Sequence, residues 1–343
     1  MGCIVHEECI EELLEKGWVR DVFSKVKSKG KAILTHLDLS YVNNLYDERK
    51  KSNRGRPPDY SPEMKLRSIL YCLASNVKKI RPMARKLRET LAWLICRFTK
   101  SSPSASTLSR FLFFLGGIIE EFFYHLSVFA AGLGIYSSVF LADTTSIEVS
   151  EDDPDGKWNY DATKQEWYYG YGLMVVVDWK THLPSAALFT NGKHVGDKEI
   201  REGLKRMYRV TTPTLFIGDG EFDTKNTHQF LLDKGTLPVI RYNPRNSRKS
   251  VPFTFRVEEF VRERTQGKVH LNVKQLRQDY RKRIEAEHSI STMKSLGLEQ
   301  PCTVGYNAVK THTFLMLIYR LAIGIYRYIE QPDANLREVK IEL

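Results

Sequence analysis

Two aspartates each follow an apolar run that is typical of a buried strand. Asp143 comes directly after Val139–Ala142, and Asp219 comes two residues after Thr214–Ile217. Sites in open α/β sheets form at the ends of strands, and Mg²⁺ prefers hard oxygen ligands such as carboxylates. Converging carboxylates could therefore hold a pair of divalent ions, an arrangement suited to phosphodiester chemistry. For either aspartate alone, a turn or strand-end cap is the alternative interpretation.

Helical spacing selects a third acid. Tyr280, Arg283, Glu287 and Lys294 are separated by 3, 4 and 7 residues. At about 100° per residue they share one stripe about 60° wide on a helix. Glu285 falls on a different side, so Glu287 is the better candidate for the third carboxylate. The alternative is a solvated helix face on which Arg283 and Glu287 pair four residues apart.

The residues that must position these acids alternate between strand and helix patterns. From residue 139 onward we expect three strands, a helix, a strand, a helix, a strand and further helices. The expected strands are 139–142, 168–178, 183–189, 214–217 and 237–242, and the expected helices are 197–208, 224–233, one from about 275 and a long one through 329. This order is that of an RNase H-like domain, so the predicted fold class is α/β, a mixed sheet flanked by helices.

The residues before 139 predict several short helices. Ser-Pro-Glu at 61–63 is a helix start, with serine as the cap and proline at the first helical position. A second start at 101–104 opens a helix in which Ser106, Thr107 and Arg110 lie early, ahead of an apolar run. A helix-turn-helix that reads DNA would have such a polar first turn. A plain helical bundle is the alternative, and both give an all-α N-terminal domain.

The basic charge lies in two blocks. The chain has a net charge of +11, with 16 Lys and Arg against 5 Asp and Glu in residues 46–110 and 13 against 4 in residues 241–283. Such blocks suit a polyanion, because cationic side chains near a duplex displace its counterions. Solvated basic helix faces are the alternative for either block.

Two apolar stretches resemble membrane spans. Phe122–Ala142 has no charged residue, but two glycines divide it and its second part has a strand pattern, while Thr313–Ile329 contains two arginines. We therefore expect a helix, a turn and a strand in the first, and a core-packed helix in the second. Five scattered cysteines do not form a disulfide framework, which favours a reducing compartment.

Several motifs now add up to a resemblance. The spacing Tyr280-x2-Arg283-x3-Glu287-x6-Lys294 matches the Tyr-Arg-Glu-Lys signature of bacterial and archaeal insertion-sequence transposases with a DDE catalytic triad. The remaining matches are Asp143-Thr-Thr and Asp219-Gly-Glu-Phe-Asp223, which resemble the first two acidic motifs, and 55–64 and 104–111, which resemble the helical N-terminal domain. The likeness covers about residues 55 to 330.

The resemblance implies a transposase. Asp143, Asp219 and Glu287 would bind two Mg²⁺ or Mn²⁺ ions, cleave the ends of an insertion sequence and join its 3′-hydroxyl ends to target DNA. Tyr280, Arg283 and Lys294 would hold phosphates, and Ser106, Thr107 and Arg110 would contact DNA. The partners would be the element's terminal repeats and target DNA, with a homodimer in the DNA complex. The expected location is the prokaryotic cytoplasm, at the nucleoid.

Some alternatives stay open at this stage. A silent transposase-derived DNA-binding protein, and a metal-dependent nuclease without strand transfer, would both carry these motifs. Only 68 residues separate Asp219 from Glu287, which leaves room for a small basic insertion at about 243–275 and leaves open whether a DNA hairpin forms. Trp158, Trp167 and Trp179 could stack on a flipped base, although packing is the favoured interpretation. The expected domains are 1–45, helical; 46–135, helical, basic and DNA-binding; and 136–343, catalytic.

Overall fold

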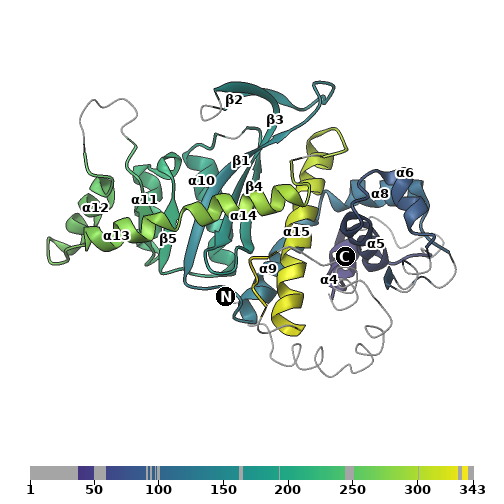
Figure 1. The fold of residues 1–343 in the computed structure, drawn as a ribbon, viewed down its shortest axis with the longest axis horizontal. Helices are drawn as coiled ribbons and strands as arrows, with labels where there is room; N and C mark the ends of the chain where they lie inside the picture. The colour runs from purple at the N-terminus through teal and green to yellow at the C-terminus, as the bar shows by residue number, and fades with distance from the viewer. Residues whose placement is uncertain are drawn as a thin grey trace. The chain divides into compact units, whose positions relative to one another are not determined.

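A computed structural model describes residues 38–49, 59–89, 92, 95, 96, 98, 101–161, 165–192, 194–243, 251–299, 301–330 and 334–338. Most of the predicted segment 1–45 lies outside these residues. The chain divides into two compact units (Figure 1). The helical unit comprises residues 1–133, 306–334 and 338–343, and the sheet unit comprises residues 134–305 and 335–337. Each is described below by itself.

The helical unit is built from helices whose starts the sequence encodes. Its described helices are α4 (Tyr41–Arg49), α5 (Pro62–Ala74), α6 (Ile80–Lys86), α8 (Ala105–Leu115), α9 (Ile119–Gly132) and α15 (Tyr306–Glu330). The Ser61 hydroxyl accepts the backbone N–H of Met64 at the start of α5, and Ser104 does the same for Thr107 at the start of α8. Both caps satisfy a backbone donor that a helix start leaves unpaired.

The long apolar helix α15 belongs to this unit. It packs against α9, α8 and α5, and Phe314 meets Phe123 of α9 ring to ring at 5.6 Å. The sequence interpretation grouped it with the catalytic domain, because it follows that domain in the chain. Tertiary contacts instead join it to helices about 200 residues earlier.

Within the described residues, α15 has the length and composition to cross a membrane, and α8 with α9 would do so only as a pair bent by 74°. However, 89% of the apolar window of α15 is buried inside the protein, and the side chain of Arg320 in this helix is fully buried. A helix that is apolar all round and covered by protein is a core helix.

The sheet unit contains the predicted mixed sheet. Its strands are β1 (Val139–Glu148), β2 (Lys157–Asp161), β3 (Glu166–Asp178), β4 (Pro184–Thr190), β5 (Leu215–Gly218) and β6 (Leu237–Ile240). The order is β2-β3-β1-β5-β6, and β4 also pairs with β3. β1, β3 and β4 are antiparallel neighbours, whereas β1, β5 and β6 are parallel. The RNase H-like prediction is therefore confirmed.

Helices flank this sheet. They are α10 (Asp197–Val210), α11 (Lys225–Asp233), α12 (Phe255–Thr265), α13 (Val273–Arg281) and α14 (Ile284–Ser295). α10 packs on β4 and β3, α11 to α13 pack at the β6 side, and α14 packs on β1 (Figure 1). The single helix predicted from about residue 275 is two helices. Lys282 and Arg283 form a tight turn between them, with hydrogen bonds to the carbonyls three residues earlier.

Candidate functional site

The pairing of β1 with β5 places Asp143 beside Asp219. The two strands are parallel, and Ala142 stands opposite Gly218 in their register. Each aspartate is the next residue along its chain, and the backbone of Asp219 is still extended. Because neighbouring strands lie about 4.8 Å apart, the two aspartates start from adjacent backbone positions. β1 does not end at Asp143, as the sequence suggested, because pairing with β3 carries it on to Glu148.

Asp143 interacts electrostatically with the other two predicted acids, Asp219 and Glu287. Burial raises the pKa of Asp143 to about 6, and the negative charges of Asp219 and Glu287 act in the same direction. The backbone N–H of Thr144 and the charge of Arg283 oppose that rise. A buried carboxylate near two others is a position at which a bound cation would be stabilised.

The helix signature places the Glu287 carboxylate and the Arg283 guanidinium near Asp143. Arg283 Nη2 lies 2.6 Å from Glu287 Oε1, and the side chains are 28% and 49% exposed. Burial opposes the charged form of Arg283, but the hydrogen bond and charge of Glu287, together with Tyr280 and Asp143, outweigh it and raise the pKa of the guanidinium. Tyr280 lies close enough to interact electrostatically with Arg283, Asp219 and Asp143. Electrostatic interactions therefore link Asp143 and Asp219 to Tyr280, Arg283 and Glu287.

Lys294 lies two turns farther along α14 and has a different partner. Its ammonium group pairs with Glu299, whose carboxylate also accepts the hydroxyl of Thr145 at 3.3 Å. This chain of contacts joins the end of α14 to β1, two residues beyond Asp143. Lys294 thus flanks the acids along β1 and is bonded to a carboxylate outside the triad.

Glu221 is a residue of this site that sequence reasoning missed. Its carboxylate accepts the Thr144 hydroxyl at 2.8 Å and the backbone N–H of Val195 at 3.1 Å. It also lies 2.8 Å from Nδ1 of His194. Because Thr144 follows Asp143 in β1 and Glu221 is two residues after Asp219, Glu221 joins β1 to the loop that carries Asp219. Its place inside the second acidic motif was the available signal.

Asp223 is the last residue of the same motif, Asp219-Gly-Glu-Phe-Asp223. Its carboxylate is buried and accepts Nε of Arg256 at 2.7 Å and the backbone N–H of Asn243 at 2.8 Å, and it lies 3.0 Å from Nε2 of buried His228. Burial alone would raise the pKa of Asp223, but His228, Asn243 and Arg256 lower it below the ordinary value. Asn243 also donates to the carbonyl of Gly220 at 3.0 Å. The network therefore fixes the loop that carries Asp219.

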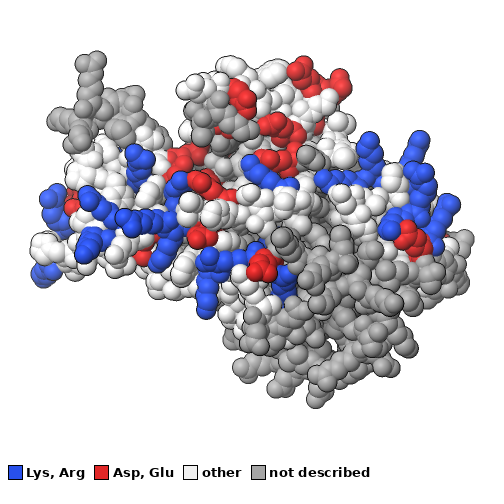
Figure 2. Space-filling model, in the orientation of Figure 1, with Lys and Arg blue, Asp and Glu red and all other residues white. Residues whose placement is uncertain are grey.

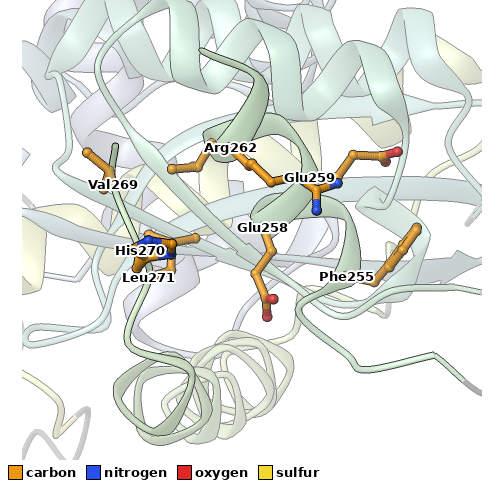
Figure 3. Close-up of a pocket in the computed structure, with 8 residues that line it drawn as sticks. Phe255, Glu258, Glu259, Arg262, Val269, His270 and Leu271 are labelled. Atoms are coloured by element: carbon orange, nitrogen blue, oxygen red, sulfur yellow. The ribbon is translucent and has the colours of Figure 1, made fainter. Parts of the chain in front are cut away.

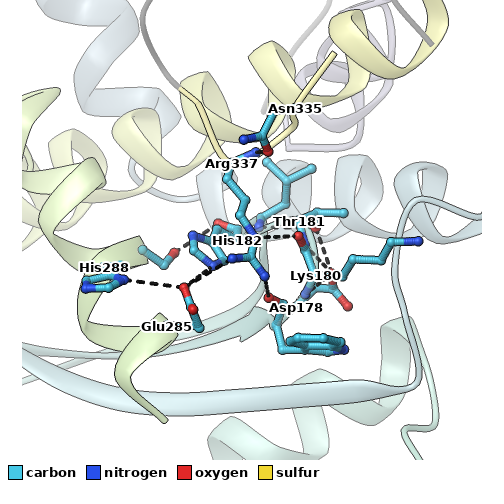
Figure 4. Close-up of polar contacts among 11 residues, drawn as sticks. Asp178, Lys180, Thr181, His182, Glu285, His288, Asn335 and Arg337 are labelled. Atoms are coloured by element: carbon cyan, nitrogen blue, oxygen red, sulfur yellow. Dashed lines mark hydrogen bonds and ion pairs between the residues drawn. The ribbon is translucent and has the colours of Figure 1, made fainter. Parts of the chain in front are cut away.

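Glu285, which helical phase had set aside, anchors α14 to the sheet. Its Oε2 atom lies 2.9 Å from Nε2 of His182 and 3.4 Å from Nη1 of Arg337 (Figure 4). Arg337 in turn donates to the carbonyls of Lys180 and Trp179 at 2.9 and 3.0 Å. These residues belong to the β3–β4 turn, so Glu285 ties α14 to that turn.

We expect Glu285→Ala to lower the free energy of unfolding by about 1.5–3 kcal/mol, because His182 and Arg337 would lose a charged partner. Cleavage of DNA should fall only as far as α14 shifts. Urea unfolding followed by circular dichroism measures the effect. Glu202→Gln, in a surface pair with Arg206 at 3.5 Å, is the control and should change stability by less than about 1 kcal/mol. Equal losses in both variants would remove the anchoring role of Glu285.

Charge is distributed unevenly over the units. Figure 2 shows Lys and Arg side chains gathered over α12 and α13 and, in the helical unit, around α6. Asp and Glu side chains gather over the β2–β3 hairpin and the loop before it. The predicted DNA contacts Ser106 and Arg110 are exposed on α8, and Thr107 is half-buried. All three residues belong to the helical unit, whereas the three predicted acids belong to the sheet unit.

A pocket of about 330 Å³ lies at α12 and the segment that follows it (Figure 3). It is lined by Phe255, Glu258, Glu259, Val261, Arg262, Val269, His270 and Leu271. None of the predicted site residues is among them. Asp143 is instead on β1, Asp219 directly follows β5, and Glu287 is on α14.

The donor set fits a hard divalent cation. Among the described residues, no three His, Cys, Asp or Glu side chains are arranged to enclose a metal ion as they stand. The Glu287 carboxylate is turned to Arg283, whereas Asp143 and Asp219 carry negative charge side by side. Oxygen donors alone, on two strands and one helix, are the ligand type that Mg²⁺ and Mn²⁺ take.

Comparison with known proteins shows which sequences and structures this chain resembles. The family model of the transposase DDE domain matches residues 137–321, and a second transposase domain model, DUF772, matches residues 21–112. The chain is 30% identical, over 310 residues, to the probable transposase for insertion sequence element ISH11 of Halobacterium salinarum, in two strains, which covers 90% of this chain and 93% of that protein. A solved piggyBac transposase synaptic complex with hairpin DNA has a TM-score of 0.43 and 9% identity over 90% of this chain and 77% of that chain.

The first of these models spans the whole sheet of the sheet unit, and the ISH11 relative extends the likeness through most of the helical unit. The resemblance drawn from the motifs is confirmed, because the matched residues extend far beyond the four-residue signature. The chain belongs to the family of transposases with a DDE domain, of the insertion-sequence type.

Proposed function

We propose that this protein cuts the ends of its insertion sequence and joins the 3′-hydroxyl ends to target DNA, with Asp143, Asp219 and Glu287 as the catalytic acids. One observation supports this most: the β1–β5 register makes the two aspartates neighbours. Glu287 lies on the helix that packs on β1 and contributes to the field at Asp143. In this proposal, acids from three separate elements meet beside the carboxyl end of β5.

Asp143, Asp219 and Glu287 would hold the metal, two Mg²⁺ or Mn²⁺ ions. Such ions, when bound, activate the attacking oxygen and stabilise the leaving oxygen of a phosphodiester. The protein's part is to keep three anionic side chains in place. Glu221 bonds Thr144 of β1 and Val195, and Asp223 bonds Asn243, so both hold the loop that carries Asp219 beside β1. Glu287 would leave its ion pair with Arg283 to bind the metal, and the Arg283 guanidinium would then be free to bind DNA.

Arg283 would then bind a phosphate next to the cleaved bond, with Tyr280 beside it and Lys294 farther along the helix. A guanidinium donates two parallel hydrogen bonds to a phosphate, which a lysine cannot do. The partner is double-stranded DNA, both the terminal repeats and the target. Ser106, Thr107 and Arg110 on α8 are proposed to contact it. The protein would act in the cytoplasm, at the nucleoid.

We expect Arg283→Ala to slow end cleavage by about 10-fold to 100-fold, which corresponds to about 1.4–2.7 kcal/mol. Arg283→Lys should recover only part of the rate. The free energy of unfolding should change by less than about 1 kcal/mol, because the pair with Glu287 is partly exposed. Arg281→Ala removes one exposed charge two residues away and is the control. A loss of stability that matches the loss of rate would make Arg283 a structural residue.

The proposal is tested by incubating the protein with Mg²⁺ and DNA that carries the element's own terminal repeats. Metal-dependent 3′-hydroxyl nicks, followed by joining to a target plasmid, are the expected products. Nicks without joined products would indicate a nuclease. A footprint on the repeats without cleavage would indicate a silent DNA-binding protein.

A further inference from the structure

The exposed face of α8 carries one large apolar side chain among polar ones. Its exposed residues lie within about 100° of one another around the helix axis. They are Ser106, Ser109, Arg110 and Phe113. The opposite face is apolar and buried, and it consists of Leu108, Phe111 and Leu115. Phe113 is 87% exposed, the largest fraction among the large apolar side chains of the described residues. Because single exposed apolar residues are common, the surroundings of Phe113 decide what it contacts.

The helices beside Phe113 carry an excess of positive charge. Residues 78–115 contain 9 Lys and Arg against a single acid, Glu89, and Glu89 is paired with Lys86 at 2.7 Å. α6 packs on α8, and Figure 2 shows the Lys and Arg side chains around α6. The exposed cations of α6 and its flanks are Lys79, Arg81, Arg85 and Arg88. The exposed acids Asp47 and Glu48 lie on α4, which packs on α5 and α9. A surface of this charge attracts the phosphates of DNA.

α8 has the size and the polar first turn of a helix that lies in the major groove of DNA. Its 11 residues span about 16 Å, and the groove, about 12 Å wide, admits one α-helix. The Ser104 hydroxyl lies 2.9 Å from that of Ser106 and 3.0 Å from that of Thr107. Three hydroxyls that can donate to phosphates thus gather at the start of the helix. Arg110 and Phe113 follow one and two turns after Ser106 on the exposed face, where a helix in the groove meets the base edges.

Only one group on the base edges of the major groove is apolar. The other edge groups are hydrogen-bond donors and acceptors, whereas thymine also carries a C5-methyl group. The phenyl ring of Phe113 has no donor or acceptor, so this methyl group is the base group that it matches. We propose that Phe113 recognises a thymine in the terminal repeats by packing on its C5-methyl group, while the cations of α6 hold nearby phosphates. This inference rests on the proposed function, because it takes the terminal repeats as the DNA partner of α8.

Deoxyuridine in place of thymidine tests the contact, because its base lacks only the C5-methyl group. Fluorescence anisotropy without divalent metal measures binding of the full chain to repeat duplexes in which thymines are replaced one at a time. For the wild type, at least one replacement should weaken binding about 4-fold, the effect of burying one methyl group. Phe113→Ala should bind the unmodified repeat at least about 4-fold more weakly, and the same replacement should then have no further effect. Phe113→Leu keeps an apolar side chain and should keep part of the sensitivity.

Three controls separate recognition of a base from attraction to phosphates. On a duplex of scrambled sequence, Phe113→Ala should bind within about 2-fold of the wild type, because phosphate contacts dominate non-specific binding. Arg85→Ala removes an exposed cation of α6 and should weaken binding to both duplexes by the same factor, with the salt slope reduced by about 1. Val304→Ala, at an exposed apolar residue of the sheet unit, should change neither. Unchanged circular dichroism of each variant confirms that its fold is intact.

The inference is wrong if no deoxyuridine weakens binding by the wild type, if Phe113→Ala keeps the wild-type sensitivity to the methyl group, or if this variant loses affinity equally for repeat and scrambled duplexes. An altered sedimentation coefficient of Phe113→Ala with unchanged DNA binding would place the ring in a protein interface instead. Failure of the proposed cleavage is distinguishable, since the wild type would then sense the methyl group without nicking the repeats in Mg²⁺. Conversely, if Phe113→Ala cuts thymine and deoxyuridine repeats at wild-type rates, the proposed function stands without this contact.

Discussion

Replacing Asp143 or Asp219 by Asn, or Glu287 by Gln, should lower the rate of Mg²⁺-dependent end cleavage at least about 1000-fold. That loss corresponds to about 4 kcal/mol of transition-state stabilisation, the size expected when a ligand to a catalytic metal is removed. Binding to the terminal repeats should be kept, because the basic surfaces are unchanged. Single-turnover cleavage and a gel-shift titration measure the two properties separately.

The matched control lies on the same helix. Glu285→Gln replaces an acid two residues before Glu287, but its carboxylate faces His182 and Arg337. Cleavage by this variant should stay within about 10-fold of the wild-type rate, the effect of about 1.4 kcal/mol. Should Glu285→Gln abolish cleavage while Glu287→Gln cuts normally, the third acid has been assigned to the wrong residue.

Asp223→Asn should destabilise the sheet unit by about 3–5 kcal/mol, the cost of leaving buried charge without its partner. Arg256 donates to this carboxylate, and an amide of the same shape cannot carry the charge that balances the guanidinium. Urea unfolding monitored by circular dichroism gives the free energy. Asp233→Asn on α11, whose side chain is 53% exposed in its pair with Arg264, is the surface control and should cost less than about 1 kcal/mol.

The same carboxylate predicts how stability changes with pH. The pKa of Asp223 is lowered in the folded state, so its stabilisation is complete above the unfolded value of about 3.9 and is lost as pH falls through the folded value. Burial lowers the pKa of His228, so the folded state also loses stability as pH falls below about 6.5, where the unfolded histidine takes up a proton. If the stability of the Asp223→Asn variant still falls steeply below about pH 4, that loss belongs to other carboxylates.

Local spacing predicted features that depend on residues close together in the chain. Helical periodicity predicted that Arg283 and Glu287 lie side by side with Tyr280 nearby, although Lys282 and Arg283 form a tight turn between two helices. The caps Ser61 and Ser104 were readable for the same reason, because a cap acts within three residues.

Features that depend on distant parts of the chain do not follow from local spacing. The convergence of Asp143 and Asp219 was expected from the order of strands and helices and from the family resemblance, and its physical basis is the β1–β5 register, which joins residues 76 positions apart. Glu221 reaches Thr144 over 77 residues. α15 joins the helical unit through tertiary packing, which the chain order concealed. β2 was missed because three of its five residues are exposed, which removes the apolar run that marks a buried strand.

The central claim is that Asp143, Asp219 and Glu287 hold the same divalent ions. A crystal structure of the protein with Mn²⁺ and terminal-repeat DNA, with the ions located by anomalous scattering, tests it most directly. We predict anomalous peaks about 2.0–2.6 Å from carboxylate oxygens of all three residues, with Arg283 released from Glu287 and turned to a phosphate. Ions bound elsewhere, or a Glu287 that remains on Arg283 while the metal sites are full, would contradict the account.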